Sequence, residues 1–125
     1  MKTIFTSMFA TTLLMFAGNA LAMDMPEAAK KNRCAACHAI DKKIIGPAWM
    51  DVSKFYNGKI EKTAAGKTLK EATGDKAPAD WLLIKVSNGG TGNWGTGIME
   101  PNDPTGKKQD EIKRLIQFVL GLAKQ

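Results

Sequence analysis

The chain has 125 residues, of which 44% are hydrophobic and 24% charged, and its formal net charge is +6. A chain of this length predicts one domain. Its lysines are scattered among acidic residues, and no basic cluster is interleaved with aromatic side chains, so the composition argues against nucleic-acid binding.

Residues 1–22 have the order of a secretory signal peptide. Lys2 supplies a positive start, residues 3–23 carry no charge, and Ala20-Leu21-Ala22 places small residues at the two positions that a signal peptidase reads. A membrane-spanning helix is the alternative, but the apolar segment is too short and is interrupted by threonine, serine and glycine. We expect cleavage after Ala22. The remaining domain, residues 23–125, would have a net charge of +5 and no stable membrane insertion.

The first half of that domain predicts two helices separated by a turn. Pro26 suits the first turn of a helix, and the good helix formers of Ala28–Ala36 continue it. Ile44–Pro47 is expected to be an extended turn, because proline disfavours helix in the residue before it. Asp51–Tyr56 predicts a short helix that Asn57-Gly58 ends.

The second half predicts two further helices and an irregular loop. Glu61–Glu71 is rich in lysine and is compatible with a helix or a solvated loop. Asp80 is expected to cap a helix over Trp81–Ser87. Residues 88–97 include five glycines and predict irregular structure. Apolar residues at helical spacing over Ile112–Leu122 predict an amphipathic helix.

Together these elements predict an all-α single domain of three to five short helices with long loops. A secreted domain of this size forms only a small core and usually needs a further stabilising element. The only disulfide available joins Cys34 to Cys37, and so short a loop constrains the unfolded chain very little. The two cysteines are therefore expected to serve another purpose.

The run Cys34-Ala35-Ala36-Cys37-His38 is the attachment signature of a c-type haem. Thioether bonds from the two cysteines would fix the porphyrin edge to the backbone, and His38 could then turn its ring toward the iron as the proximal ligand. The planar apolar group would also supply the missing core, so we expect short helices wrapped around one covalently attached haem.

Other uses of the motif fit the sequence less well. A thioredoxin-like redox centre follows a strand in an α/β pattern, which is not visible in this sequence. A zinc site needs a fourth ligand, and the chain has no further cysteine or histidine. Asp41 could be that ligand, but four ligands within eight residues make an implausible cage.

A second axial ligand cannot be histidine, because His38 is the only histidine in the chain. Methionine is the usual partner. Met23 and Met25 lie at the N-terminus of the domain, and Met50 follows the histidine too closely to reach the far face of the haem. Met99 lies in a polar, glycine-rich loop far along the chain, where close approach of the backbone to a porphyrin is permitted. Met99 is therefore the expected ligand.

The sequence resembles the small bacterial class I cytochromes c, which are periplasmic single-haem electron carriers. The resemblance covers most of residues 23–125 and includes the C-terminal amphipathic helix. The motifs that carry it are Cys34-Ala35-Ala36-Cys37-His38, Ile45-Gly46-Pro47-Ala48, Asn88-Gly89-Gly90, Trp94-Gly95, Ile98-Met99 and Pro101-Asn102.

The resemblance implies a role for four residues beyond the haem-attachment motif. Met99 would be the distal ligand, and the carbonyl of Pro47 would accept a hydrogen bond from the His38 ring and fix its tautomer. Trp94 would donate a hydrogen bond to a haem propionate, with simple packing as its alternative role, and Asn102 would approach the Met99 sulfur.

The sequence departs from the family pattern in two places. The segment Lys59–Ala79 looks longer than its counterpart in the most compact members. The family often has proline on both sides of the methionine, whereas Ile98 and Glu100 flank Met99. The second departure would loosen the loop and place a negative charge near the iron.

The leading functional hypothesis is an electron carrier in the periplasm that has no enzymatic activity. Lysines around the exposed haem edge would steer brief docking to an acidic surface on a reductase, an oxidase or a cytochrome complex. One alternative is a haem enzyme or gas sensor with an open or displaceable iron position. Another is a subunit of a larger complex that retains the same fold.

Overall fold

The computed structural model describes residues 23–124, and the expected signal peptide lies outside these residues. The described chain forms five α-helices and two 3₁₀ helices: α1 (Glu27–Lys31), η1 (Cys34–Ala36), α2 (Trp49–Tyr56), α3 (Leu69–Thr73), α4 (Pro78–Asn88), α5 (Gln109–Gly121) and η2 (Leu122–Lys124). The described residues form no strand longer than an isolated bridge. The all-α prediction is therefore confirmed.

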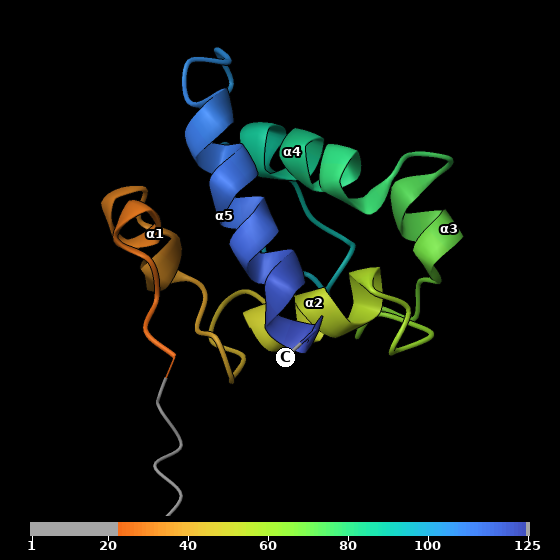
Figure 1. Ribbon diagram of the computed structural model, residues 1–125. Helices are drawn as coiled ribbons and strands as arrows, with labels where there is room; N and C mark the ends of the chain where they lie inside the picture. The colour runs from red at the N-terminus through yellow and green to blue at the C-terminus, as the bar shows by residue number, and fades with distance from the viewer. Residues whose placement is uncertain (1–22, 125) are drawn as a thin grey trace, which may run out of the picture.

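Helix α5 is the centre of the fold. Figure 1 shows α4 packed across one end of α5, α2 across the other end, and α1 beside it. The apolar stripe predicted from the sequence is buried in α5, where Ile112, Leu115, Ile116 and Val119 are at most 7% exposed. Phe55 of α2 is fully buried against the same core. Burial of this stripe holds the other helices around α5.

Two predicted helix limits are wrong. The first helix ends at Lys31, because Arg33 adopts a left-handed backbone with φ 62° and the Asn32 side chain bonds back to the Ala28 carbonyl. The cysteines consequently lie on the separate turn η1. Helix α4 begins at Pro78, whose fixed φ suits the first helical position, so Asp80 lies inside the first turn and does not cap the helix.

The Lys59–Ala79 segment contains both a tight turn and a helix. Lys62 and Thr68 form an isolated antiparallel bridge around the turn. Thr68 then begins α3 with a capping box, in which its hydroxyl accepts from the Glu71 N–H and the Glu71 carboxylate accepts from the Thr68 N–H. None of the helices in residues 23–124 is long and apolar enough to span a lipid bilayer.

Candidate functional site: a cavity between His38 and Met99

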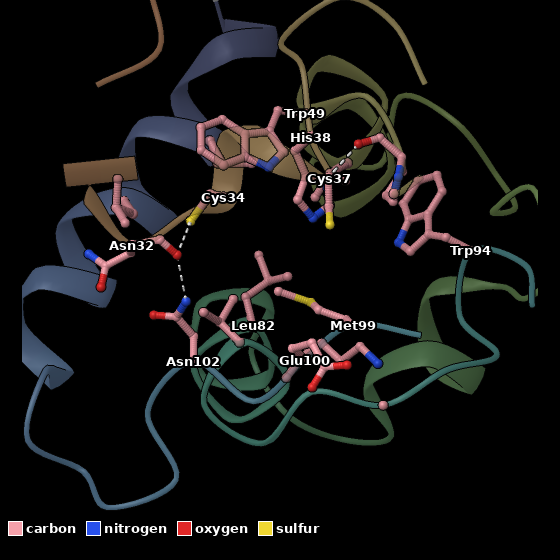
Figure 2. Close-up of a pocket in the computed structure, with 18 of the residues that line it drawn as sticks. Asn32, Cys34, Cys37, His38, Trp49, Leu82, Trp94, Met99, Glu100 and Asn102 are labelled. Carbon is pink, nitrogen blue, oxygen red and sulfur yellow. Dashed lines mark hydrogen bonds between the residues drawn. The ribbon is translucent and has the colours of Figure 1, made fainter. Parts of the chain in front are cut away.

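A cavity of about 500 Å³ lies between the η1 turn, helices α4 and α5, and the loop that follows α4. This volume is within the range of small-molecule and cofactor sites. Figure 2 shows Cys34, Cys37, His38 and Met99 around the same space, with His38 and Met99 on facing sides. The wall that α4 and α5 supply is apolar and is formed by Leu82, Val86, Ile112, Leu115, Ile116 and Val119. The cavity therefore suits a large apolar group with a few polar contacts.

The two cysteines lie on the cavity wall and are not joined to each other. The left-handed turn at Arg33 redirects the chain, and η1 then brings both thiols to the same side. The Cys34 thiol is a weak donor to the Asn32 carbonyl, 3.9 Å away, and burial raises the pKa of Cys34. A raised pKa disfavours the thiolate that a thioredoxin-like centre or a zinc site requires. Within residues 23–124, no group of three or more Cys, His, Asp and Glu side chains is placed to hold a metal ion.

His38 has a fixed ring orientation. Its Nδ1 lies 2.9 Å from the Pro47 carbonyl oxygen, so the Nδ1–H donates to this carbonyl and Nε2 carries the free lone pair. Burial lowers the pKa of His38 below its usual 6.5, against the opposing effect of the bond to Pro47. The neutral ring with Nε2 unprotonated is the form that binds a metal ion.

The absence of a side chain at Gly46 leaves room for the His38 ring. The Gly46 N–H donates to the Cys37 carbonyl at 2.8 Å, which folds the Ile44–Pro47 turn back over the motif. A Cβ atom on Gly46 would lie 2.4 Å from Cε1 of His38. Only glycine therefore permits the observed position of the imidazole.

Met99 is held by the loop that follows α4. Gly90 and Met99 exchange two backbone hydrogen bonds of 2.8 and 3.0 Å, and Gly89, at φ 68°, passes so close that a Cβ there would lie 2.2 Å from the Met99 carbonyl oxygen. Of the four methionines in residues 23–124, Met99 is the one that lines the cavity. Met50 packs against the hydrophobic core from α2.

Trp94 lines the cavity near one end of α2. Its ring packs edge-on against Phe55, with centroids 5.6 Å apart. Tyr56 lies beside it and accepts a hydrogen bond of 3.1 Å from Trp81 Nε1. Burial raises the pKa of Tyr56, while the hydrogen bond from Trp81 opposes that increase. Trp94 thus has a packing role in the structure.

Asn102 connects the methionine loop to the cysteine motif. Its Nδ2 donates to the Asn32 backbone carbonyl at 3.0 Å, as Figure 2 shows. Its backbone N–H donates to the Val86 carbonyl oxygen, also at 3.0 Å. Its Oδ1 is buried without a hydrogen-bond partner. The side-chain amide of Asn102 is thus bonded to Asn32, a residue that the sequence did not mark as part of the site.

Sequence reasoning also missed other contributors to the cavity. The sequence predicted only an amphipathic helix over Ile112–Leu122, and in the structure the apolar residues of α5 also form a cavity wall. Trp49, at 7% exposure, packs beside His38 with ring centroids 5.9 Å apart. Lys85 lines the cavity from α4. The spacing of apolar residues in α5 could not distinguish a face that packs in the protein core from one that lines a cofactor cavity, because both require the same residue types.

This chain is similar to known proteins in both sequence and fold. The cytochrome c family profile matches residues 22–123. Cytochrome c-551 of Pseudomonas aeruginosa is 37% identical over 115 residues, which cover 91% of this chain and 90% of that protein. Cytochrome c-552 of Nitrosomonas europaea is 34% identical over 122 residues, covering 98% and 99%. The crystal structure of wild-type Nitrosomonas europaea cytochrome c552 matches with a TM-score of 0.55 at 30% identity, covering 76% of this chain and 95% of that one.

The family match spans nearly the whole of the domain, and both cysteines of the haem-attachment motif are present. The cavity also has the apolar walls that a porphyrin requires. The cofactor is therefore covalently bound haem c with its iron. The chain belongs to the cytochrome c family, as a small class I electron-transfer cytochrome with one haem.

Proposed function

We propose that this chain is a periplasmic electron carrier whose haem is attached through Cys34 and Cys37 and whose iron is bound by His38 and Met99. The observation that carries the proposal is the placement of His38 and Met99 on facing sides of one cavity. The hydrogen bond from His38 Nδ1 to Pro47 leaves Nε2 as the free nitrogen, which supports ligation through that atom.

When bound, the haem supplies an iron that exchanges one electron between its ferrous and ferric forms. The protein's part is to hold both axial ligands in place and to exclude water. Gly89 and Gly90 position Met99 by close backbone contacts, while the α4 and α5 wall keeps the cavity apolar. A methionine opposite a histidine raises the reduction potential, which suits a carrier.

Trp94 and Asn102 have supporting roles in this proposal. Trp94 lines the cavity and would donate its indole N–H to a haem propionate. Asn102 would help to hold Met99, with its amide anchored to Asn32 as described above. These roles follow from the family pattern together with the placement of both side chains on the cavity wall.

The proposed partners are redox proteins with acidic docking surfaces, such as a reductase, an oxidase or a cytochrome complex. The domain carries a net charge of +5 and only one ion pair among residues 23–124, so most of its lysines are available for steering. The proposed location depends on residues 1–22 acting as a cleaved leader. The family match beginning at residue 22 supports that division, and the exported protein should begin at Met23.

Two spectroscopic measurements test the central proposal. The ferric haem-loaded protein should show the weak far-red charge-transfer band of iron bound to methionine sulfur, and the ferrous protein should bind carbon monoxide only slowly. A ferric protein without that band, whose ferrous form binds carbon monoxide at once, would contradict His38/Met99 ligation and favour an enzyme or gas sensor.

A further inference from the structure

Asn32 connects the haem-attachment motif to the start of α5. Its amide lies between two oppositely charged side chains: Nδ2 donates to the Glu111 carboxylate, and Oδ1 accepts from the Lys108 ammonium at 3.1 Å. Each end of the amide thus faces the charge that suits it, because an amide nitrogen donates and an amide oxygen accepts. These two contacts fix the side-chain orientation of a residue that lies two positions before Cys34.

The Lys108 ammonium also reaches the methionine loop. Its Nζ donates to the Asn102 backbone carbonyl at 3.2 Å, three residues beyond Met99. Asn102 Nδ2 in turn donates to the Asn32 backbone carbonyl at 3.0 Å (Figure 2). Three hydrogen bonds therefore form a closed triangle of Lys108, Asn32 and Asn102, and all three residues line the cavity. This triangle joins the cysteine motif, the methionine loop and the start of α5.

The backbone of Lys108 is itself anchored. Its N–H donates to Asp103 Oδ2 at 2.9 Å, and Asp103 is only 3% exposed. The two acceptors of the ammonium are a side-chain amide and a backbone carbonyl, and the only ion pair among residues 23–124 joins Lys30 to Glu27. Salt screens interactions between charges, so hydrogen bonds to these neutral acceptors should depend on salt less than an ion pair would.

We propose that Lys108 is a positioning residue for Met99 that acts through Asn102. It holds the end of the methionine loop against the haem-attachment motif, so displacement of Met99 from the iron must strain or break the triangle. This inference rests on the proposed ligation of the iron by Met99. The alternative role of Lys108 is an exposed surface charge that attracts acidic partners, and the two roles predict different responses to salt.

Imidazole binding to the ferric haem-loaded protein tests this role, because imidazole binds the iron only when Met99 leaves it. Lys108→Met keeps an unbranched apolar side chain but removes the ammonium. The variant should bind imidazole about twofold to fivefold more tightly than the wild type, the range expected for loss of hydrogen bonds at an exposed site. This tightening should persist at high salt. Titrations followed by absorbance measure it.

Lys107→Met is the matched control. Lys107 is the exposed neighbour whose backbone N–H, which the substitution retains, bonds to Asp103. This variant has the same net charge as Lys108→Met and should bind imidazole as the wild type does. Lys108→Arg keeps a cationic donor and should also stay close to the wild type. Denaturant titration of each variant measures folding separately.

Equal changes in imidazole affinity for Lys108→Met and Lys107→Met would overturn the inference, because Lys108 would then act only as a surface charge. Unchanged affinity in Lys108→Met, whatever its free energy of unfolding, would also overturn it, because the triangle would not restrain Met99. The far-red band of the ferric wild type reports methionine ligation separately. If that band is present, a negative result concerns Lys108 alone. If it is absent, the proposed ligation fails and this inference fails with it.

Discussion

The imidazole of His38 lies directly against the backbone of Gly46: a Cβ atom there would lie 2.4 Å from Cε1 and 2.8 Å from Nδ1. The same turn presents the Pro47 carbonyl to Nδ1. One short turn therefore fixes both the position and the tautomer of the ring.

Gly46→Ala should displace the imidazole, because neither the ring nor the adjoining backbone can accept a contact of this length. We expect a destabilisation of about 1–3 kcal/mol in the free energy of unfolding, as for other overpacking substitutions. The low-spin fraction of the ferric iron should also fall. Denaturant titration and the visible absorption spectrum of the haem-loaded protein measure the two effects.

Gly121→Ala is the matched control. Gly121 lies in α5, and a Cβ there would meet no atom within 4 Å. Alanine should be neutral or stabilise the helix by up to about 1 kcal/mol. If Gly46→Ala behaves like this control, the ring does not depend on the turn for its position.

Met99→Ala should retain the covalent haem but open the sixth iron position. Met99 lines the cavity, whereas Met50 packs against the core from α2. The Met99 variant should lose the far-red band and bind carbon monoxide rapidly in the ferrous state, and Met50→Ala should keep the wild-type spectrum. Stopped-flow carbon monoxide binding distinguishes them. Rapid binding by the Met50 variant and slow binding by the Met99 variant would reverse the ligand assignment.

Much of this arrangement could be predicted from the sequence, because some residue patterns have few structural solutions. Apolar residues at helical spacing predicted the last helix, and burial of Ile112 and Leu122 in the structure confirms its packing face. The CxxCH run predicted a haem, and the family match confirms that cofactor. The selection of Met99 rested on its glycine-rich loop and remains a prediction, supported by its place on the cavity wall.

The contacts between distant segments could not be predicted in this way. Arg33 adopts a left-handed backbone that its residue type disfavours, so the helix break before Cys34 depends on tertiary structure. The pairing of Asn102 with Asn32 joins positions 70 residues apart, and no local pattern encodes such a pair. The sequence did not distinguish Lys67 from the other lysines of its segment, whereas in the structure its Nζ donates a hydrogen bond to Asn93 Oδ1.

Asn102→Ala should make Met99 easier to displace from the iron. The substitution removes the bond to Asn32 that ties the methionine loop to the cysteine motif. A hydrogen bond of this kind contributes about 1 kcal/mol, so imidazole should bind the ferric protein roughly fivefold more tightly. The cost to global stability should be small, because the variant also removes a buried oxygen that has no partner. Imidazole titration followed by absorbance measures this change.

Asn57→Ala provides the control for that experiment. Asn57 also makes an amide hydrogen bond between distant segments, to the Leu120 carbonyl at 2.9 Å, but it does so at the C-terminal end of α5. Its loss should lower the free energy of unfolding without changing imidazole affinity. Equal imidazole affinities for both variants would mean that the Asn102–Asn32 bond does not restrain Met99.

Asp103 is expected to make the stability of the start of α5 depend on pH. Burial by itself disfavours its charged form, but hydrogen bonds from Gln109 Nε2 (3.0 Å) and from the backbone N–H groups of Lys108 (2.9 Å) and Lys107 (2.8 Å) outweigh that effect. The pKa of Asp103 is therefore lowered from its usual 3.8. A lowered carboxyl pKa gives stability that is complete above the unfolded value and is lost as the pH falls through the folded value.

Asp103→Asn should therefore be less stable than the wild type at neutral pH, by a margin that stays constant down to about pH 4 and shrinks in stronger acid. Denaturant titrations at a series of pH values measure this margin in the haem-loaded protein. Asp110→Asn, which alters an exposed carboxylate in the first turn of the same helix, should show a much smaller margin. A margin for Asp103→Asn that grows as the pH falls would mean that the carboxylate destabilises the folded chain, contrary to the hydrogen bonds it accepts.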